Sequence, residues 1–488
     1  MKKLVTLFLF LLIANFSFAQ QETLAVDTSF GSDGILTPEL PDLNITDMML
    51  KGFYILENDK VLFVFDVEIS NYSTYLIFRC NSDGSLDNTY NSPSGYVQLE
   101  EINDIDLRNK VTTNPALTEE NDLILGYRDA ICKLNADGNV DTSFGEAGVR
   151  TYEPFPEGML SIIENNGSIY RVIANFISDN RKFQKLLSNG DIDEEYGSGG
   201  GYTSPVISIT NYDGNPNYMS FKFRSDGGFY FLLSSYPYGQ GSVYNSISAK
   251  NFNPEGFSIA SNTLANSNFG EGDPYSGASI VHNDKLILNY SLYNHNGGIY
   301  TYRSKRFNSD LSLDETYGFN ETHLDFPFAL SVNNANDNKL WFFSEYNDEK
   351  IISRINENGT FDTGFSGNGT FTLSNLGLGV NFNPGFKVKD NSLYFPSDNF
   401  TIVKLNVIEN LSTQDIGKKD VKIYPNPATD KLYFENLEKP STVKILNAEG
   451  KFIMEKTVEP KGFIDISALP KGVYVVILDG SSYKFIKN

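Results

Sequence analysis

The sequence predicts an all-β protein, a seven-bladed β-propeller followed by a small immunoglobulin-like β-sandwich. Three observations lead to this prediction. A short polar phrase recurs seven times between residues 81 and 406. The segments between its copies are strand-like runs separated by turn residues, with no long apolar period of 3.6 residues. The net charge changes sign after residue 420, which indicates a separate C-terminal domain.

Composition limits the possible functions. The 488 residues include 39 Lys and Arg against 61 Asp and Glu, a net charge of −22. Nucleic-acid binding needs a basic face that displaces counterions from phosphate, so we expect no nucleic-acid partner. Two cysteines cannot build a disulfide scaffold, and 40% hydrophobic residues are too many for a disordered chain. The length exceeds that of one compact core, so we expect at least two domains.

The first element is a predicted signal peptide, residues 1–19. Two lysines at positions 2 and 3 precede an apolar run, and Ser17 and Ala19 supply small residues before the expected cleavage point. The run is too short to anchor the chain in a bilayer. No later stretch approaches the roughly 20 apolar residues of a membrane span, so we expect no membrane-spanning segment.

The second element, residues 20–407, contains the recurring phrase. Its clearest copies are Asn81–Asp87, Asn135–Asp141, Asn308–Asp314 and Asn356–Asp362, which approximate the pattern Asn-x-Asp-Gly-x-φ-Asp, where φ is apolar. Weaker copies begin at residues 187 and 253, and a truncated one ends at residue 406. The spacings between copies, 48 to 66 residues, fit a four-stranded blade, so seven copies predict seven blades.

One unit illustrates the expected blade. Its predicted strands are Gly148–Tyr152, Met159–Glu164, Ser168–Phe176 and Phe183–Leu187. The phrase before it continues into Phe-Gly-x-x-Gly; we expect Phe144 to fill the core between blades and the glycines to turn the chain into the next blade. The complete phrase resembles the delta-60 repeat of bacterial exported proteins over roughly residues 22–407. That family has no shared activity to transfer to this chain.

A polar linker is predicted at residues 408–420, followed by a domain at residues 421–488. This tail holds 10 Lys against 8 Asp and Glu, a net charge of +2, whereas residues 20–420 carry −26. Turn residues divide the tail at the spacing of a β-sandwich. Seven short strands are expected there: Val421–Tyr424, Lys431–Phe434, Thr442–Leu446, Phe452–Thr457, Phe463–Ile466, Val473–Leu478 and Tyr483–Ile486.

The tail also carries several spaced motifs in a fixed order. They include Tyr424, Pro425, Asn426, Pro427, Gly450, Gly472 and Tyr474. With the final residues 483–487, these motifs resemble the type A C-terminal sorting domain of the type IX secretion system. The resemblance implies a Bacteroidota-type cell, periplasmic transit, and a final location that is extracellular or on the outer-membrane surface. It implies the type IX translocon and a surface sortase as partners. The alternative is an ordinary immunoglobulin-like accessory domain, for example a carbohydrate-binding one.

No catalytic or metal-binding motif is present. The only histidines, His282, His295 and His323, lack zinc-site spacing, and we expect each to be a surface or loop residue rather than a ligand. Cys80 and Cys132 fall on equivalent last strands of consecutive blades. A disulfide needs Cα atoms within about 7 Å, closer than packed sheets allow, so we expect two buried free thiols.

The recurring phrase has two interpretations. It supplies oxygen ligands at alternate positions and a glycine, as a calcium loop does, but it lacks the bidentate Glu at the twelfth position. A tight hairpin turn demands the same residues, since Asn and Asp hydrogen-bond their own backbone and Gly takes a positive φ. We expect the turn and therefore no cofactor, with calcium as the alternative.

Two classes of function stay open. The first is a surface-displayed or released binding or adhesion module that engages glycan or protein. The second is a secreted carbohydrate-active hydrolase or lyase that uses carboxylates or tyrosines in the propeller channel. Tyrosines in the loops 236–244 and 290–300 offer flat faces for sugar rings, or they cover strand edges in blade hairpins. The absence of a nucleophile or metal motif favours the binding module, so we assign no catalytic residue and expect no enzyme.

Overall fold

The computed structural model of the chain describes residues 21–488 with internal gaps. The gaps are residues 70, 111, 153–158, 176–179, 198–206, 209–215, 236–245, 267–272, 295–298, 319–328, 336–337, 347, 384, 411–420, 436, 438, 448–450 and 479–480. The predicted signal peptide lies outside the described residues. The chain divides into two compact units, Met1–Leu411 and Ser412–Asn488. The regular elements described in both units are β-strands and three short 3-10 helices, η1 (Glu57–Asp59), η3 (Leu373–Leu376) and η4 (Asp398–Phe400).

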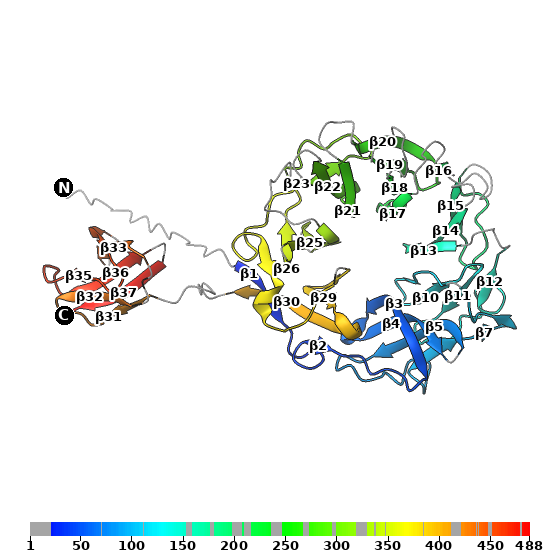
Figure 1. The fold of residues 1–488 in the computed structure, drawn as a ribbon, viewed down its shortest axis with the longest axis horizontal. Helices are drawn as coiled ribbons and strands as arrows, with labels where there is room; N and C mark the ends of the chain where they lie inside the picture. The colour runs from blue at the N-terminus through cyan, green and yellow to red at the C-terminus, as the bar shows by residue number, and fades with distance from the viewer. Residues whose placement is uncertain are drawn as a thin grey trace, which may run out of the picture. The chain divides into compact units, whose positions relative to one another are not determined.

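Seven antiparallel sheets of three to five strands, with one separate two-stranded hairpin, make up the described part of the first unit; Figure 1 shows the sheets arranged in a ring. The first three sheets are β3 (Ile45–Ile55), β4 (Val61–Ile69), β5 (Tyr72–Cys80) and β6 (Tyr96–Leu99); β9 (Ala116–Leu117), β10 (Leu123–Gly126), β11 (Ala130–Leu134) and β12 (Val149–Thr151); and β13 (Met159–Asn165), β14 (Ser168–Asn175), β15 (Asn180–Leu186) and β16 (Ile207–Ser208). A separate hairpin pairs β7 (Glu101–Ile102) with β8 (Ile105–Asp106).

The next three sheets continue in chain order. They are β17 (Pro216–Phe223), β18 (Phe229–Ser235), β19 (Ser246–Phe252) and β20 (Ser258–Asn266); β21 (Asp273–His282), β22 (Lys285–Asn294) and β23 (Ile299–Phe307); and β24 (Ala329–Asn334), β25 (Leu340–Tyr346), β26 (Glu349–Ile355) and β27 (Thr370–Thr372). First strands such as β13, β17 and β21 lie on the inner side of the ring (Figure 1).

The seventh sheet joins the two ends of the first unit. Its strands β28 (Lys387–Lys389), β29 (Ser392–Pro396) and β30 (Ile402–Asn410) come from the end of the unit, and its outer strand β1 (Gln21–Val26) comes from the beginning. Strand β1 pairs antiparallel with β30, and the two-residue strand β2 (Ile35–Leu36) pairs with β30 as well. The first and last described segments of the unit therefore lie side by side, with β1 in blue in Figure 1.

The hydrophobic core of this unit lies between neighbouring sheets. The middle strands are buried over nearly their whole length, as in residues 61–65 of β4 and 74–78 of β5, because each sheet is covered on both faces. One cluster joins Ile124 and Ile131 of one sheet to Ile162 and Ile169 of the next, with Phe144 among them. Phe144 is 1% exposed, so the prediction that it fills the core between sheets is confirmed.

The predicted strand grouping is wrong by one strand. The segment that begins at Gly148 contains β12, which pairs with β11 of the preceding sheet rather than opening the next one. Gly145 and Gly148, with φ of 58° and 106°, reverse the chain directly after Phe144. The glycines therefore return the chain to its own sheet, so the recurring phrase connects the third strand of a sheet to its outer strand.

The second unit contains two sheets around its own core. One sheet has the order β31-β32-β35 and the other β34-β33-β36-β37. The seven strands all lie within two residues of their predicted bounds: β31 (Lys422–Tyr424), β32 (Lys431–Glu435), β33 (Ser441–Asn447), β34 (Phe452–Val458), β35 (Phe463–Asp465), β36 (Gly472–Leu478) and β37 (Ser481–Lys487). Side chains from both sheets, including Leu432, Ile445, Ile464 and Val476, form one buried cluster.

Candidate functional site

The recurring phrase forms a tight turn after the third strand of a sheet. In the copy at Asn135–Asp141, the backbone N–H groups of Asp137 and Asn139 donate to Asn135 Oδ1 at 3.1 and 2.9 Å. The N–H of Gly138 donates to the carbonyl of Asn135 at 2.8 Å, and Gly138 has a φ of 83°. The amide oxygen of Asn135 is thus engaged by the backbone. This geometry is the one expected of a hairpin-type turn.

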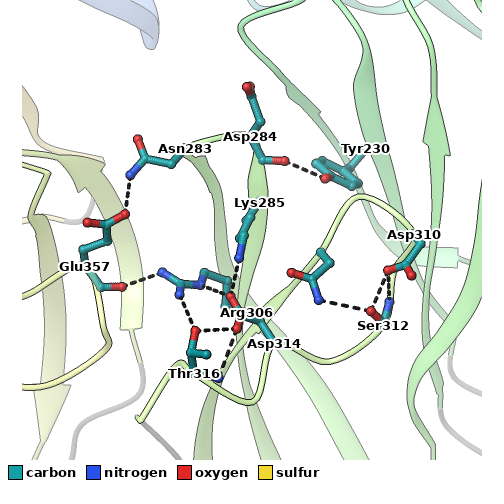
Figure 2. A network of polar contacts seen from close by, with 11 residues as sticks. Tyr230, Asn283, Asp284, Lys285, Arg306, Asp310, Ser312, Asp314, Thr316 and Glu357 are labelled. Atoms are coloured by element: carbon teal, nitrogen blue, oxygen red, sulfur yellow. Dashed lines mark hydrogen bonds and ion pairs between the residues drawn. The ribbon is translucent and has the colours of Figure 1, made fainter.

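The last aspartate of the phrase is the centre of an ion-pair cluster, shown for Asp314 in Figure 2. Lys285 Nζ and Arg306 Nε each donate to Asp314 Oδ2 at 2.7 Å. The backbone N–H and the hydroxyl of Thr316 donate to Oδ1 at 3.0 and 2.6 Å. Burial opposes ionisation of this carboxyl, but the hydrogen bonds from Lys285, Thr316 and Arg306 outweigh it and hold its pKa below the ordinary range.

The same cluster recurs around the ring. Five phrase aspartates, Asp314 included, pair with a cation on the third strand of their sheet. The pairs are Asp87 with Arg79 and Lys60, Asp141 with Lys133, Asp362 with Arg354 and Lys339, and Asp27 with Lys404. In four of the copies the third-strand cation precedes the aspartate by eight residues, as Arg306 precedes Asp314. Sequence reasoning missed this pairing, although the eight-residue spacing is a signal that could have revealed it.

Each turn also contacts the neighbouring sheet. Arg306 Nη1 donates to the carbonyl of Glu357 at 2.5 Å, and the N–H of Gly318 donates to the carbonyl of Asn358 at 2.7 Å. Glu357 and Asn358 belong to the turn of the next sheet. The side chain of Tyr317, three residues after Asp314, is 1% exposed. The Arg306 guanidinium lies over its ring, with Cζ 5.0 Å from the ring centroid. We call this arrangement of aspartate, cation, aromatic ring and neighbouring turn the latch.

The aromatic ring of a latch packs on the glycine of the next turn. A Cβ at Gly138 would lie 2.7 Å from the ring of Tyr90, and a Cβ at Gly190 would lie 2.6 Å from the ring of Phe144. Backbone bonds accompany these contacts: the N–H of Asn91 donates to the carbonyl of Asp137 at 2.6 Å. The phrase is therefore a device that joins sheets.

In the latches, the carboxylates of the phrase aspartates accept hydrogen bonds from several donors. An ionised carboxylate with several donors is an acceptor and cannot donate a proton, so none of these aspartates is suited to general acid catalysis. In the described residues, no group of three or more His, Cys, Asp or Glu side chains is placed to hold a metal ion.

The expectation for His282 is wrong. It is 6% exposed at the end of β21, with Nδ1 3.0 Å from Asn334 Oδ1 and Nε2 3.1 Å from the carbonyl of Asn338. Its partners lie more than 50 residues away in the next sheet, so their proximity follows from tertiary packing. His295 and His323 lie outside the described residues.

The prediction of two buried free thiols is confirmed for Cys80 and Cys132. Burial raises the pKa of Cys80 to about 12 and that of Cys132 further, which makes both thiols unreactive. Their predicted position on last strands is corrected to the third strands β5 and β11, for the same reason as the strand grouping.

The two tyrosine-rich loops differ in what the structure describes. The loop 236–244 lies outside the described residues. In the segment 290–300, Tyr290 belongs to β22 and is 1% exposed, and residues 299–300 belong to β23. This part is a hairpin within a sheet, and Tyr290 is a core residue rather than a ligand platform.

In the C-terminal unit, Asn426 fastens the Tyr424–Pro427 segment to the last strand. Its Nδ2 donates to the carbonyl of Lys484 at 3.0 Å, and the N–H of Ile486 donates to its Oδ1 at 2.9 Å. Pro425 and Pro427 flank it, each after a cis peptide bond. Tyr424 points outward and is 48% exposed.

The remaining motif residues lie elsewhere in the unit. Gly472 begins β36. Tyr474 is a core residue, 5% exposed; its hydroxyl donates to the carbonyl of Pro470 at 2.8 Å and its ring stacks on Phe485. Gly450 lies outside the described residues. The structure thus places the segment Tyr424–Pro427 beside β37 and buries Tyr474 in the core of the unit.

Two protein-family models match parts of the chain. Residues 422–488 match the "Secretion system C-terminal sorting domain". Residues 126–144 match a beta-propeller "Domain of unknown function (DUF5122)". The second match covers β11 and the latch turn up to Phe144. A comparison with curated protein sequences gives no match.

Several solved structures are distantly similar. PorZ, a surface component of the type-IX secretion system of Porphyromonas gingivalis, is 11% identical with a TM-score of 0.38, covering 92% of this chain and 60% of its own. Polysaccharide lyase Uly1 is 11% identical with a TM-score of 0.44, covering 80% and 98%. The beta-propeller domain of the Trilobed protease from Pyrococcus furiosus is 10% identical with a TM-score of 0.36, covering 77% and 95%. The chain thus spans about 60% of the PorZ chain.

None of these similarities is strong enough to assign a function.

Among the described residues, no helix has the length and apolarity needed to cross a membrane.

Proposed function

We propose that the chain is exported to the cell surface or the medium through a type IX secretion system, with residues 421–488 as the sorting signal. The match of residues 422–488 to a secretion-system sorting domain carries this proposal. The signal peptide at residues 1–19 directs the chain to the periplasm of a Bacteroidota-type cell. The translocon and a surface sortase are then its partners.

The exported part is proposed to be a seven-bladed β-propeller of the delta-60 repeat type, residues 20–407. The seven sheets of the first unit are its blades, the pairing of β1 with β30 closes it, and the latches join one blade to the next. Residues 408–420 form the linker, and the two small sheets of the tail form an immunoglobulin-like sandwich. Closure of a propeller protects sheet edges from pairing with other chains, which suits a protein exposed outside the cell.

The proposed activity is binding or adhesion, with glycan or protein as the ligand. In five copies of the recurring phrase, the last aspartate is engaged in a latch, so the most regular set of carboxylates in the chain has a structural role. A ring of packed sheets is a scaffold on which loops present a ligand surface.

A carbohydrate-active hydrolase or lyase is the second candidate. One observation favours it: burial raises the pKa of the Glu164 carboxyl, and the negative charges of Glu119 and Glu120 raise it further. Glycoside cleavage uses a carboxylic acid with a raised pKa as its proton donor. Glu164 Oε1 also accepts a 2.7 Å hydrogen bond from the N–H of Gly167, so it has a structural role in the β13–β14 turn.

Removal of residues 422–488 tests the routing. We expect the truncated chain to fold and accumulate in the periplasm, because the first unit has its own core and the tail carries the address. Cell fractionation of the full-length and truncated chains measures this. Recovery of the truncated chain at the surface or in the medium would refute the proposal.

A glycan array and a polysaccharide-degradation assay on the full-length chain separate the two activities. Glycan binding without product supports the binding module. Polysaccharide cleavage that Glu164→Gln abolishes, while glycan binding persists, would replace it with the enzyme.

A further inference from the structure

Three aromatic side chains form a row on the outward face of the sheet β31-β32-β35. Tyr424 lies opposite Tyr433, and Tyr433 lies opposite Phe463, on adjacent strands. The ring centroids are 5.6 and 5.7 Å apart. Tyr424 and Phe463 are 48% and 47% exposed. We call these three residues the aromatic row.

The aromatic row contributes nothing to the core of the module. The neighbouring positions on the same strands point inward: Leu432 and Ile464 belong to the buried cluster, and Ile423 packs against it. A surface strand that only needs to cover this core would carry polar side chains at its outward positions. Adjacent exposed aromatic residues therefore indicate an interaction surface.

Charged residues border the row on both sides. Lys422 lies opposite Glu435 at one border, and Lys431 lies opposite Asp465 at the other. An aromatic centre within a polar and charged rim is the usual anatomy of a protein–protein interface.

The ring geometry favours a protein over a glycan as the occupant. Tyr424 and Tyr433 are stacked with their planes 19° apart, and Lys431 Nζ lies 4.2 Å from the Phe463 centroid, over its ring. Parts of these ring faces are therefore already covered, whereas a sugar ring needs an open face. Ring edges and lysine stems remain available to apolar protein side chains.

We propose that the aromatic row is the surface through which a protein of the export machinery recognises the C-terminal module. The partner presents an apolar cleft that receives the rings, bordered by acidic residues opposite Lys422 and Lys431 and a basic residue opposite Glu435 or Asp465. This inference rests on the proposed function, since it identifies which face of the sorting signal is read.

The test is export of the full-length chain in its native host. The row variant carries Tyr424→Ser, Tyr433→Ser and Phe463→Ser. The control variant carries Phe452→Ser and Ile453→Ser, which remove exposed apolar groups (56% and 38% exposed) from β34 in the other sheet. We expect the row variant to reach the surface and medium at least tenfold less than the unaltered chain and to accumulate in the periplasm. The control variant should be exported normally.

A second variant tests the proposal in case the row variant does not fold. Resistance of the module to protease, measured on the full-length chain, reports whether the row variant is folded. If the row variant is not folded, the charge variant Lys422→Glu with Lys431→Glu tests the proposal, because it keeps the three rings and reverses the charge of the two rim lysines. It should show the same loss of export.

The outcomes separate this inference from the proposed function. Export of a chain that lacks residues 422–488 would refute the routing itself. Retention of that truncated chain, together with normal export of a folded row or charge variant, would overturn only the role of the aromatic row. Row-dependent binding of the full-length chain to a glycan array, or a row-dependent dimer in analytical ultracentrifugation, with export unchanged, would assign the surface to another occupant.

Discussion

Replacing Gly138 with alanine tests whether the latch joins neighbouring sheets. Gly138 has a φ of 83°, and a Cβ there would lie 2.7 Å from the ring of Tyr90 in the preceding sheet. Tyr90 is 1% exposed and lies 4.9 Å from the Arg79 guanidinium, so its ring has little room to move away. Gly138→Ala should therefore introduce both backbone strain and overpacking.

The magnitude follows from these two contributions. The left-handed backbone costs an alanine about 1–2 kcal/mol. Overpacking against a buried ring adds about 1–3 kcal/mol. Gly167 provides a matched control, since its φ is 76° and no atom lies within 4 Å of a Cβ built there. Gly167→Ala should show the strain alone, so Gly138→Ala should lose about 1–3 kcal/mol more unfolding free energy than Gly167→Ala.

Urea unfolding of the purified full-length chain, followed by tyrosine fluorescence and far-ultraviolet circular dichroism, measures the difference. A double variant adds a check: Tyr90→Leu removes the ring, and Gly138→Ala should then cost no more than Gly167→Ala. Equal losses for the two glycine variants in the presence of Tyr90 would refute the contact between turn and ring. The latch would then not contribute to stability at this position.

Three further predictions concern the latch and the thiols. The pKa of Asp314 in the folded protein is held below its ordinary value, so unfolding free energy should be constant above about pH 4 and fall as the pH drops further. Asp314→Asn should reduce stability at pH 7 by about 3 kcal/mol and weaken this acid dependence, as measured by urea unfolding between pH 2 and 7. Because turn hydrogen bonds engage Asn135 Oδ1, chelator and millimolar calcium should give the same melting temperature; a rise with calcium would revive the calcium-loop interpretation. Cys80 and Cys132 should not react with a thiol reagent at pH 8 in the folded chain, and both should react in urea; rapid reaction without denaturant would contradict their burial.

The local features of the fold were predictable because they depend on neighbouring residues. Turn residues and apolar alternation located all seven strands of the C-terminal unit within two residues. The Phe-Gly step identified Phe144 as a core residue, because a large apolar side chain between polar turns has few other places to go. The positive φ of Gly138 followed from its position in an Asn-x-Asp-Gly turn.

The features that depend on pairing between distant segments were not predictable in the same way. The sequence of β12 is strand-like, but it does not show whether β12 belongs to the preceding or the following sheet. The chain reversal at Gly145 and Gly148 places it beside β11 of the preceding sheet. His282 looks like a polar loop residue until Asn334 and Asn338 of the next sheet are placed beside it. The turn pattern predicts that Tyr433 and Phe463 lie on strands, but their alignment with Tyr424 depends on the register of three strands.

The last junction of the ring differs from the others because it joins the two ends of the first unit. Arg354 pairs with Glu22 of β1, the N–H of Glu22 donates to the carbonyl of Gly364 at 2.9 Å, and that of Ser366 donates to the carbonyl of Glu22 at 2.7 Å. Between consecutive sheets inside the unit, the latch contacts Arg79–Ala136 and Arg306–Glu357 join residues 57 and 51 positions apart, whereas the Arg354–Glu22 pair spans 332. Closing this junction therefore costs more chain entropy and must follow synthesis of β30. The described strands of residues 422–488 pair only with one another. Their removal should therefore leave ring closure intact, which makes periplasmic retention of the truncated chain a test of routing rather than of folding.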